Sequence, residues 1–250
     1  MDKVDSVTFE ITDHLGIITL DLPPGNYLPI PGFIPLRLFE QWIGEDDLKG
    51  LIIKGKGKNF SAGGNLEQIF KAGRKSSEIQ SLMDEGILLL NCIQDLDIPV
   101  IAAINNICFG GGLEIALACH IRVASENALF AFPEANQNLM PGMGGTYRLP
   151  GLIGHQQALN LILGGDMVNA SAGKEMGLID YIAPKNQAFE FSMNLMHKMT
   201  HDRPLKVIKS IMKSLSNVRT LGREMAMVEE TRLFCSLAAD EAERRKTEEA

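Results

Sequence analysis

Two glutamates and a run of three glycines in the middle of the chain are the residues best suited to chemistry. Gly110, Gly111 and Gly112 follow a short apolar run, and Glu114 and Glu134 come after them. Glycine lets backbone N–H groups approach a ligand with no Cβ in the way. At the N-terminus of a helix such groups are unpaired and carry the positive end of the helix dipole, which suits an oxygen that becomes negative. The segment therefore predicts an oxyanion site with two carboxylates beside it.

A strand and a helix on either side of the glycines would position these groups. Residues 100–104 are wholly apolar, which is typical of a strand buried on both faces. Residues 115–119 predict an apolar helix, so the glycines would lie at its N-terminus. Residues 76–95 carry apolar side chains at helical spacing and predict an amphipathic helix of about five turns.

The region before this segment predicts a hairpin, a proline-rich loop and another turn that leads into a helix. Residues 7–11 and 16–20 alternate or run apolar, which favours a hairpin. Residues 22–35 hold five prolines and two glycines, so we expect a helix only from Pro35 to Gly44. Residues 51–54 predict a buried strand, and Asn65 is a good N-cap for a helix that begins near Leu66.

Four segments, taken in their order and spacing, resemble the crotonase superfamily, the enoyl-CoA hydratase and isomerase family. They are PPGNYL at 23–28, KNFSAGGNL at 58–66, the block at 97–134 and PGMGGT at 141–146. The likeness extends from about Val7 to about Pro204. It implies an α/β fold, a crotonase-like spiral of repeated ββα units with a C-terminal helical region. We expect a core at 1–186 and a helical oligomerisation region at 187–250, and the resemblance implies homotrimers that often pair as hexamers.

The resemblance also implies which residues hold the substrate. Gly64 and Gly111 would donate their amides to the thioester carbonyl, forming an oxyanion hole that stabilises an enolate. Ala62 would contact the substrate, and Gly142 would bind there too, as an amide donor to the attacking water. Two methionines, Met140 and Met143, would line the pocket. Candidate cations for the phosphates of coenzyme A are Lys54, Lys56 and Lys58, or Arg203, Lys206 and Lys209.

Glu114 and Glu134 match the two carboxylates that hydratases of the family use. Adding water to a 2-enoyl thioester needs a base for the water and an acid for Cα, and two glutamates that share one water can do both. Two close carboxylates in an apolar pocket also raise one pKa, so that one stays protonated near neutral pH. We therefore expect reversible hydration of an α,β-unsaturated acyl-CoA, with the acid and base not yet assigned to either residue.

Three alternatives stay open. An enoyl-CoA isomerase can use the same enolate with one carboxylate. A specialised hydratase or dehydratase acting on a dienoyl, cyclic or carrier-bound thioester is suggested by the prolines at 29–35. A catalytically silent acyl-CoA-binding subunit is the third alternative. Two further positions depart from the family pattern: Asn65, which keeps a capping oxygen where Asp is usual, and His120, which we interpret as structural variation.

Composition and charge exclude several classes of function. The 250 residues suffice for one large domain, and a net charge of −7 argues against a nucleic-acid partner. No run approaches 18 apolar residues and the first residues lack the features of a signal peptide, so we expect a cytoplasmic protein without a membrane partner. The four cysteines form no CxxC and predict reduced thiols without a metal site. Neither GxGxxG nor a Walker loop occurs, so no cofactor is expected besides the coenzyme A thioester itself, which is the substrate.

Overall fold

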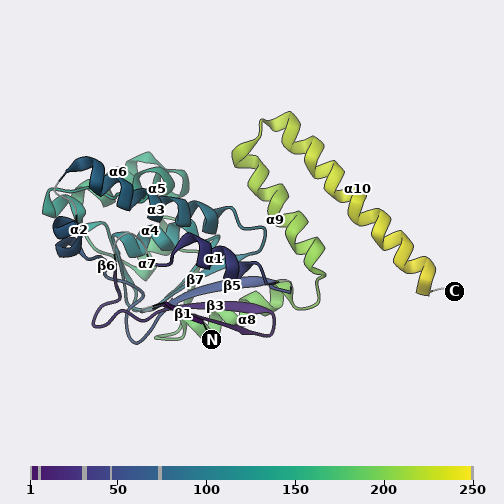
Figure 1. Ribbon diagram of the computed structural model, residues 1–250, viewed down its shortest axis with the longest axis horizontal. Helices are drawn as coiled ribbons and strands as arrows, with labels where there is room; N and C mark the ends of the chain where they lie inside the picture. The colour runs from purple at the N-terminus through teal and green to yellow at the C-terminus, as the bar shows by residue number, and fades with distance from the viewer. Residues whose placement is uncertain (1, 5–6, 30–32, 46, 73–74, 249–250) are drawn as a thin grey trace.

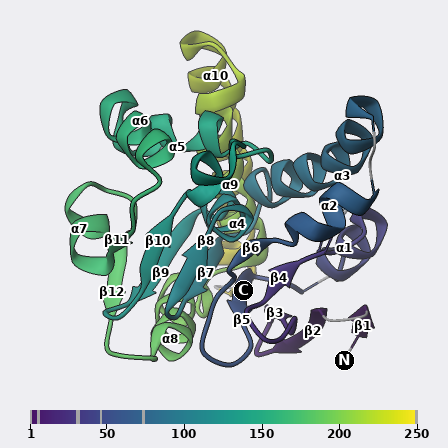
Figure 2. The ribbon, with the colours of Figure 1, turned by 90° about the vertical axis from the view of Figure 1, so that its left-hand side faces the viewer.

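The computed structural model describes residues 2–4, 7–29, 33–45, 47–72 and 75–248. Its centre is a seven-stranded sheet, which Figures 1 and 2 show from two sides. The strands, in spatial order, are β1 (Asp2–Val4), β2 (Val7–Thr12), β3 (Leu15–Leu20), β5 (Gly50–Gly55), β7 (Val100–Ile104), β9 (Ile121–Ser125) and β12 (Tyr181–Ala183). Pairing is antiparallel from β1 to β3 and parallel from β3 to β12.

From β3 to β10, successive strands alternate between this large sheet and two small ones. The strands of the small sheets are β4 (Tyr27–Leu28), β6 (Gly63–Gly64), β8 (Ile107–Phe109), β10 (Leu129–Ala131) and β11 (Val168–Asn169). β4 pairs with β6, while β10 pairs with both β8 and β11. Helices follow each pair of strands: α1 (Leu36–Ile43), α2 (Leu66–Ala72), α3 (Ser76–Gln94), α4 (Gly111–Ala118), the 3₁₀ helix η1 (Pro133–Gln137) and α5 (Gly145–Ile153). This repeated strand–strand–helix path confirms the predicted α/β spiral.

The central strands of the large sheet are largely buried on both faces, since their alternate side chains enter two different clusters. Leu51 and Ile53 of β5 belong to the main core, together with apolar residues of α3 and α4. Ile52 of β5 and Ile101 of β7 point the other way and pack against α8 (Ala188–Thr200). All five residues of β7 are buried, as the apolar run at 100–104 predicts.

The local signals before the centre of the chain are confirmed. β2 and β3 form the expected hairpin, with Asp13 and His14 in its turn at φ of 50° and 63°. α1 begins after Pro35 and ends at Gly44. Asn65 caps α2, since its Oδ1 accepts a hydrogen bond from Gln68 N at 3.2 Å. Of the proline-rich loop, residues 30–32, which include Pro31, lie outside the described residues.

α4 begins at Gly111, earlier than the start at 115 that its apolar residues predict. Gly110 is its cap, and Gly111 and Gly112 lie in its first turn, so the predicted position of the glycines at the helix N-terminus is confirmed. A Cβ placed on Gly112 would lie 2.7 Å from the Cβ of Ser61. Only glycine lets the helix start so close to the chain beneath it, and this tertiary contact has no local signal in the sequence.

Helices make up most of the described chain after Gly144. Gly154 separates α5 from α6 (His155–Gly164), and α7 (Ala170–Glu175), α8, α9 (Leu205–Thr220) and α10 (Arg223–Glu248) follow. α8 packs against the large sheet, whereas α9 and α10 pack against each other and extend away from the sheets (Figure 1).

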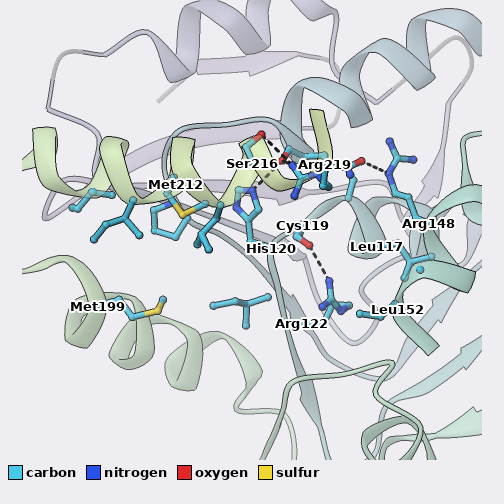
Figure 3. A pocket seen from close by; sticks show the side chains of 18 of the residues that line it. Leu117, Cys119, His120, Arg122, Arg148, Leu152, Met199, Met212, Ser216 and Arg219 are labelled. Atoms are coloured by element: carbon cyan, nitrogen blue, oxygen red, sulfur yellow. Dashed lines mark hydrogen bonds between the residues drawn. The ribbon is translucent and has the colours of Figure 1, made fainter. Parts of the chain in front are cut away.

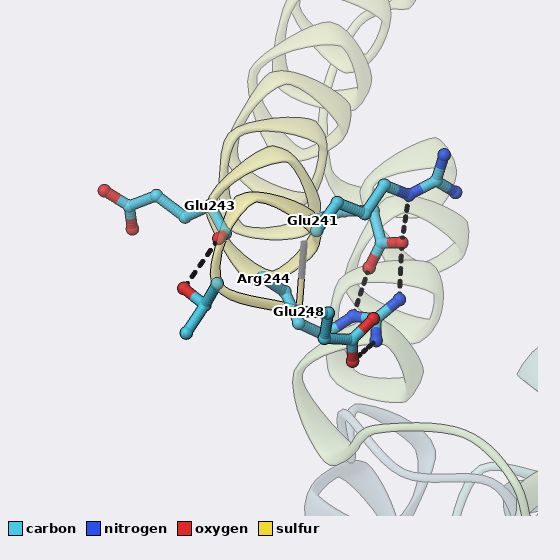
Figure 4. A network of polar contacts seen from close by, with 6 residues as sticks. Glu241, Glu243, Arg244 and Glu248 are labelled. Atoms are coloured by element: carbon cyan, nitrogen blue, oxygen red, sulfur yellow. Dashed lines mark hydrogen bonds and ion pairs between the residues drawn. The ribbon is translucent and has the colours of Figure 1, made fainter. Parts of the chain in front are cut away.

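α10 continues through the charged tail. Glu241 pairs there with Arg244 and Arg245, one turn further along the helix (Figure 4). The division of the chain at residue 186 and the oligomerisation role of the last helices stay predictions. Within the described ranges, we find no helix with the length and hydropathy needed to span a bilayer.

Candidate active site

Gly64 and Gly111, the two predicted oxyanion donors, are neighbours although they belong to different turns of the spiral. A Cβ placed on Gly111 would lie 3.6 Å from the amide nitrogen of Gly64. Gly111 is the first residue of α4, where N–H groups have no intrahelical acceptor. Asn65 N donates to Leu28 O of β4 at 3.1 Å. Successive N–H groups of a strand point in opposite directions, so the N–H of Gly64 points away from β4.

Ser61 and Asn26 hold the loop that carries Gly64. Ser61 Oγ donates to Asn26 O at 2.7 Å and accepts a hydrogen bond from Gly63 N at 3.2 Å. Asn26 Nδ2 lies 3.1, 2.8 and 3.2 Å from the carbonyl oxygens of Lys56, Asn59 and Phe60, and Asn26 Oδ1 accepts from Leu22 N at 3.0 Å. Sequence reasoning gave neither side chain a role. Their positions could have indicated this role, since both are small polar residues inside the motifs that carry the resemblance.

Ala62, a predicted substrate contact, lies two positions before Gly64 in the same loop and is half-buried. Its amide donates to Gly25 O at 2.9 Å. A Cβ on Gly25 would lie 3.3 Å from the Cβ of Ala62, so the 23–28 loop runs directly beside this position.

Glu114 is buried in the first turn of α4, with 2% of its surface exposed. Its Oε1 accepts hydrogen bonds from Met143 N at 2.7 Å and from Gly145 N at 2.8 Å. Burial raises the pKa of Glu114, while the amides of Gly145 and Met143, the Arg148 guanidinium and the Gly142 amide oppose that rise. Gly142, predicted to bind water, therefore faces the carboxyl of Glu114.

Glu134 lies in η1, beside the residue that caps α4. A Cβ on Gly110 would stand 2.6 Å from Glu134 Oε1. Glu134 Oε2 is buried without a hydrogen-bond partner among the described residues. Burial raises the pKa of Glu134 to about 7, against the opposing effect of its own backbone amide, and the negative charge of Glu114 adds to the rise. The two predicted carboxyls therefore interact, and one changes charge near neutral pH.

Methionine side chains lie next to Gly111 and Gly142. A Cβ on Gly111 would lie 3.0 Å from Met143 Cε, and a Cβ on Gly142 would lie 2.8 Å from Met83 Cε. Sequence reasoning named Met143 but missed Met83, whose helical spacing in α3 signals only an apolar face. Met140 is 64% exposed.

The lysines suggested for the coenzyme A phosphates differ in their surroundings. Lys54 Nζ lies 3.9 Å from the ring centroid of Phe189, on the face of the sheet that α8 covers. Lys56 pairs with Asp21 at 2.7 Å. On α9, Lys206 pairs with Asp240 of α10. Lys56 lies in the turn that leads to Ser61 and Gly64.

A cavity of about 830 Å³ lies away from these residues, between α4, α5, α8 and α9 (Figure 3). His120 stands in its wall, where Nδ1 accepts from Val100 N at 3.0 Å and Nε2 lies 3.1 Å from Gln94 O. Burial lowers the pKa of His120, which favours the neutral ring that these two contacts require. Among the residues that the structure describes, no group of three or more His, Cys, Asp or Glu side chains is placed to hold a metal ion.

Comparison with known proteins finds relatives over most of the chain. The family profile described as "Enoyl-CoA hydratase/isomerase" matches residues 36–249. The fatty acid oxidation complex subunit alpha of Idiomarina loihiensis is 33% identical over 225 residues, which cover 86% of this chain. The match covers 32% of that protein, so the chain spans about a third of the length of this relative.

Solved structures share the fold over nearly the whole chain. Pseudomonas aeruginosa DspI has a TM-score of 0.86 at 30% identity, covering 95% of this chain and 90% of that one. An enoyl-CoA hydratase from Bacillus anthracis has a TM-score of 0.81 at 27% identity, covering 97% of each chain.

Proposed function

The chain belongs to the enoyl-CoA hydratase/isomerase family, and from that premise we propose that it is an enoyl-CoA hydratase, a lyase acting on α,β-unsaturated acyl-CoA thioesters. One observation carries this proposal. Two interacting carboxyls, Glu114 and Glu134, flank the start of α4 at the point where Gly64 approaches Gly111. Hydration needs an acid, a base and an oxyanion site at one place, and the same groups in reverse remove water.

The amides of Gly64 and Gly111 would hold the thioester oxygen. As the oxygen of water bonds to Cβ, the electron pair of the double bond moves to the thioester carbonyl and an enolate forms. Each amide donor to such an oxyanion is worth about 3–4 kcal/mol in the transition state. Ala62, in the same loop as Gly64, would contact the thioester.

The surroundings of the two carboxyls support an assignment of base and acid. Two amides donate to Glu114 Oε1 and the positive charge of Arg148 is close, which favours the ionised form, so Glu114 would take the proton from water. Glu134 Oε2 lacks a partner in the described structure and burial favours its protonated form, so Glu134 would deliver the proton to Cα. Because the two groups interact, they titrate as a pair.

An isomerase is the second candidate, and a single observation favours it. A carboxyl with a pKa of about 7 and an unpartnered oxygen, as in Glu134, suits the transfer of one proton between two carbons of an acyl chain. The same residue therefore serves both reactions. The base on water, Glu114, is needed for hydration alone.

We also propose that α9 and α10 form the contacts between subunits in a homotrimer or hexamer. Apolar side chains remain exposed on both helices: Ile211, Leu215, Val218, Val228 and Phe234. Exposed apolar groups of this number on neighbouring helices are typical of surfaces that another chain covers.

The test is loss of absorbance at the enoyl-thioester band when the purified protein meets crotonyl-CoA, followed by mass analysis of the product. A gain of one water that disappears in Glu134→Gln and in Glu114→Gln supports the proposal. Longer, cyclic and carrier-bound 2-enoyl thioesters extend the test to specialised substrates. Binding of these thioesters without turnover of any of them would contradict it and favour a silent subunit.

A further inference from the structure

Arg148 links the candidate site to helix α3 through one buried guanidinium. Its Nη1 donates to Met143 O at 2.8 Å, its Nε to Gln94 Oε1 at 2.7 Å and its Nη2 to Asn91 Oδ1 at 2.7 Å. The side chain is buried, with 8% of the residue exposed. All three nitrogens therefore have a fixed acceptor, which leaves the guanidinium a single orientation.

Met143 contacts both Arg148 and Glu114 through its backbone. Its carbonyl accepts from Arg148, while its amide donates to Glu114 Oε1 at 2.7 Å. Gly144 has φ of 100°, and a Cβ there would overlap Arg148 Nη1, so glycine leaves the space that the guanidinium occupies. Gly145, the next residue, supplies the second amide to Glu114 Oε1.

We propose that Arg148 is a positioning residue: by holding Met143 O, it fixes the 143–145 backbone whose amides orient Glu114 for the attack of water. This role rests on the proposed hydratase function. Arg148 acts on Glu114 through the 143–145 backbone and through its charge, because its guanidinium is hydrogen-bonded to Met143, Gln94 and Asn91.

The charge of Arg148 has a second effect on the same carboxyl. Two charged groups face the carboxyl of Glu114: Arg148 from α5 and Glu134 from η1. Burial lowers the pKa of Arg148, and Glu114, Tyr147 and Asp95 in turn oppose this fall. Arg148 lowers the pKa of Glu114 against the effect of burial. Without this cation, Glu114 would keep its proton to higher pH and would be a weaker base for water.

The position of Arg148 also gives access for a chemical test. Arg148 lines the 830 Å³ cavity, as does Arg219, which donates to Gln94 O at 3.0 Å and pairs with Asp95 (Figure 3). Truncating Arg148 therefore opens a space that a guanidinium ion can reach from the cavity. Arg219→Ala is the matched control, since it removes a cation from the same cavity without touching residues 143–145.

The test compares the pH profiles of kcat and KM in the wild type, Arg148→Ala and Arg219→Ala. For Arg148→Ala we expect kcat to fall by about 100-fold with little change in KM, since the carboxylate is displaced and the substrate contacts stay. The acidic limb of the kcat profile should move to higher pH. Millimolar guanidinium chloride should restore part of the activity of this variant and of no other, and Arg219→Ala should match the wild type.

A readout without substrate separates failure of this inference from failure of the proposed function. Infrared titration of the carboxyl band that Glu114→Gln removes reports the protonation of Glu114 directly. Its midpoint should be higher in Arg148→Ala, or in Arg148→Met if the alanine variant does not fold, because methionine fills the space but supplies neither the charge nor the three donors. An unchanged midpoint overturns the inference, even if hydration is observed. A raised midpoint in a protein that hydrates no thioester supports the link to Glu114 and rejects the hydratase.

Discussion

Glu134 lies directly against Gly110, the residue that caps α4. A Cβ on Gly110 would stand 2.6 Å from Glu134 Oε1, and Gly110 has φ of 49°. The carboxyl of one turn of the spiral is thus held at the glycine turn of another, beside the amide of Gly111. This contact explains how residues 24 positions apart meet at one site, and why a glycine is required at position 110.

Gly110→Ala should therefore damage both the fold and the site. The substitution forces a side chain into a backbone conformation that costs about 1–3 kcal/mol for residues other than glycine, and it displaces Glu134. Urea unfolding and hydratase turnover are the measurements. Gly151→Ala is the control, since a Cβ there meets nothing within 4 Å and α5 should gain about 0.5–1 kcal/mol. Equal stability of both variants would contradict this account.

Glu134 should make the free energy of unfolding depend on pH. Its folded pKa is about 7, above its usual value near 4.5, so between these values the folded state binds more protons than the unfolded state. The wild type should therefore lose stability relative to Glu134→Gln as pH rises from 4.5 to 7, by about 1–3 kcal/mol for this partly exposed group. Glu126→Gln, an exposed change of the same kind, should preserve the wild-type dependence. If the free energies of unfolding of the wild type and Glu134→Gln changed in parallel with pH, the raised pKa of Glu134 would be contradicted.

Loss of either carboxyl should lower turnover far more than binding. Glu114→Gln and Glu134→Gln each should reduce kcat by about 10²–10⁴-fold, the usual contribution of an acid or base, with KM little changed. The double variant should be only slightly worse than either single one, because the base and the acid act together in one addition of water. Steady-state kinetics with a 2-enoyl-CoA measures this, and additive losses would show that the residues act independently.

Asn26 should be essential to the loop that carries Gly64. Asn26→Ala removes the amide that joins three carbonyls of the 56–60 turn and leaves one buried and two partly buried groups without this partner, at a cost of at least about 2 kcal/mol. Thermal unfolding measures the loss. Asn136→Ala, at an exposed asparagine, is the control and should change stability little. A variant of Asn26 as stable as this control would show that the three contacts are dispensable.

The sequence predicts the elements of this fold better than it predicts their contacts. The apolar run at 100–104 and Pro35 before α1 are local signals, so they give β7 and the start of α1 correctly. The start of α4 at Gly111 depends on how closely Gly112 packs on Ser61, which no local pattern reports. The family motifs indicate Glu114 as a site residue, but its link to Arg148 appears only in three dimensions.

Turnover in isotopically labelled water separates a hydratase from an isomerase. The protein is mixed with crotonyl-CoA in ¹⁸O-labelled heavy water, and the product is analysed by mass and NMR. We expect one ¹⁸O at Cβ and one deuterium at Cα, with neither incorporated by the double variant Glu114→Gln and Glu134→Gln. Deuterium without ¹⁸O in any product, from crotonyl-CoA or from longer 2-enoyl and 3-enoyl thioesters, would contradict the hydratase and support the isomerase.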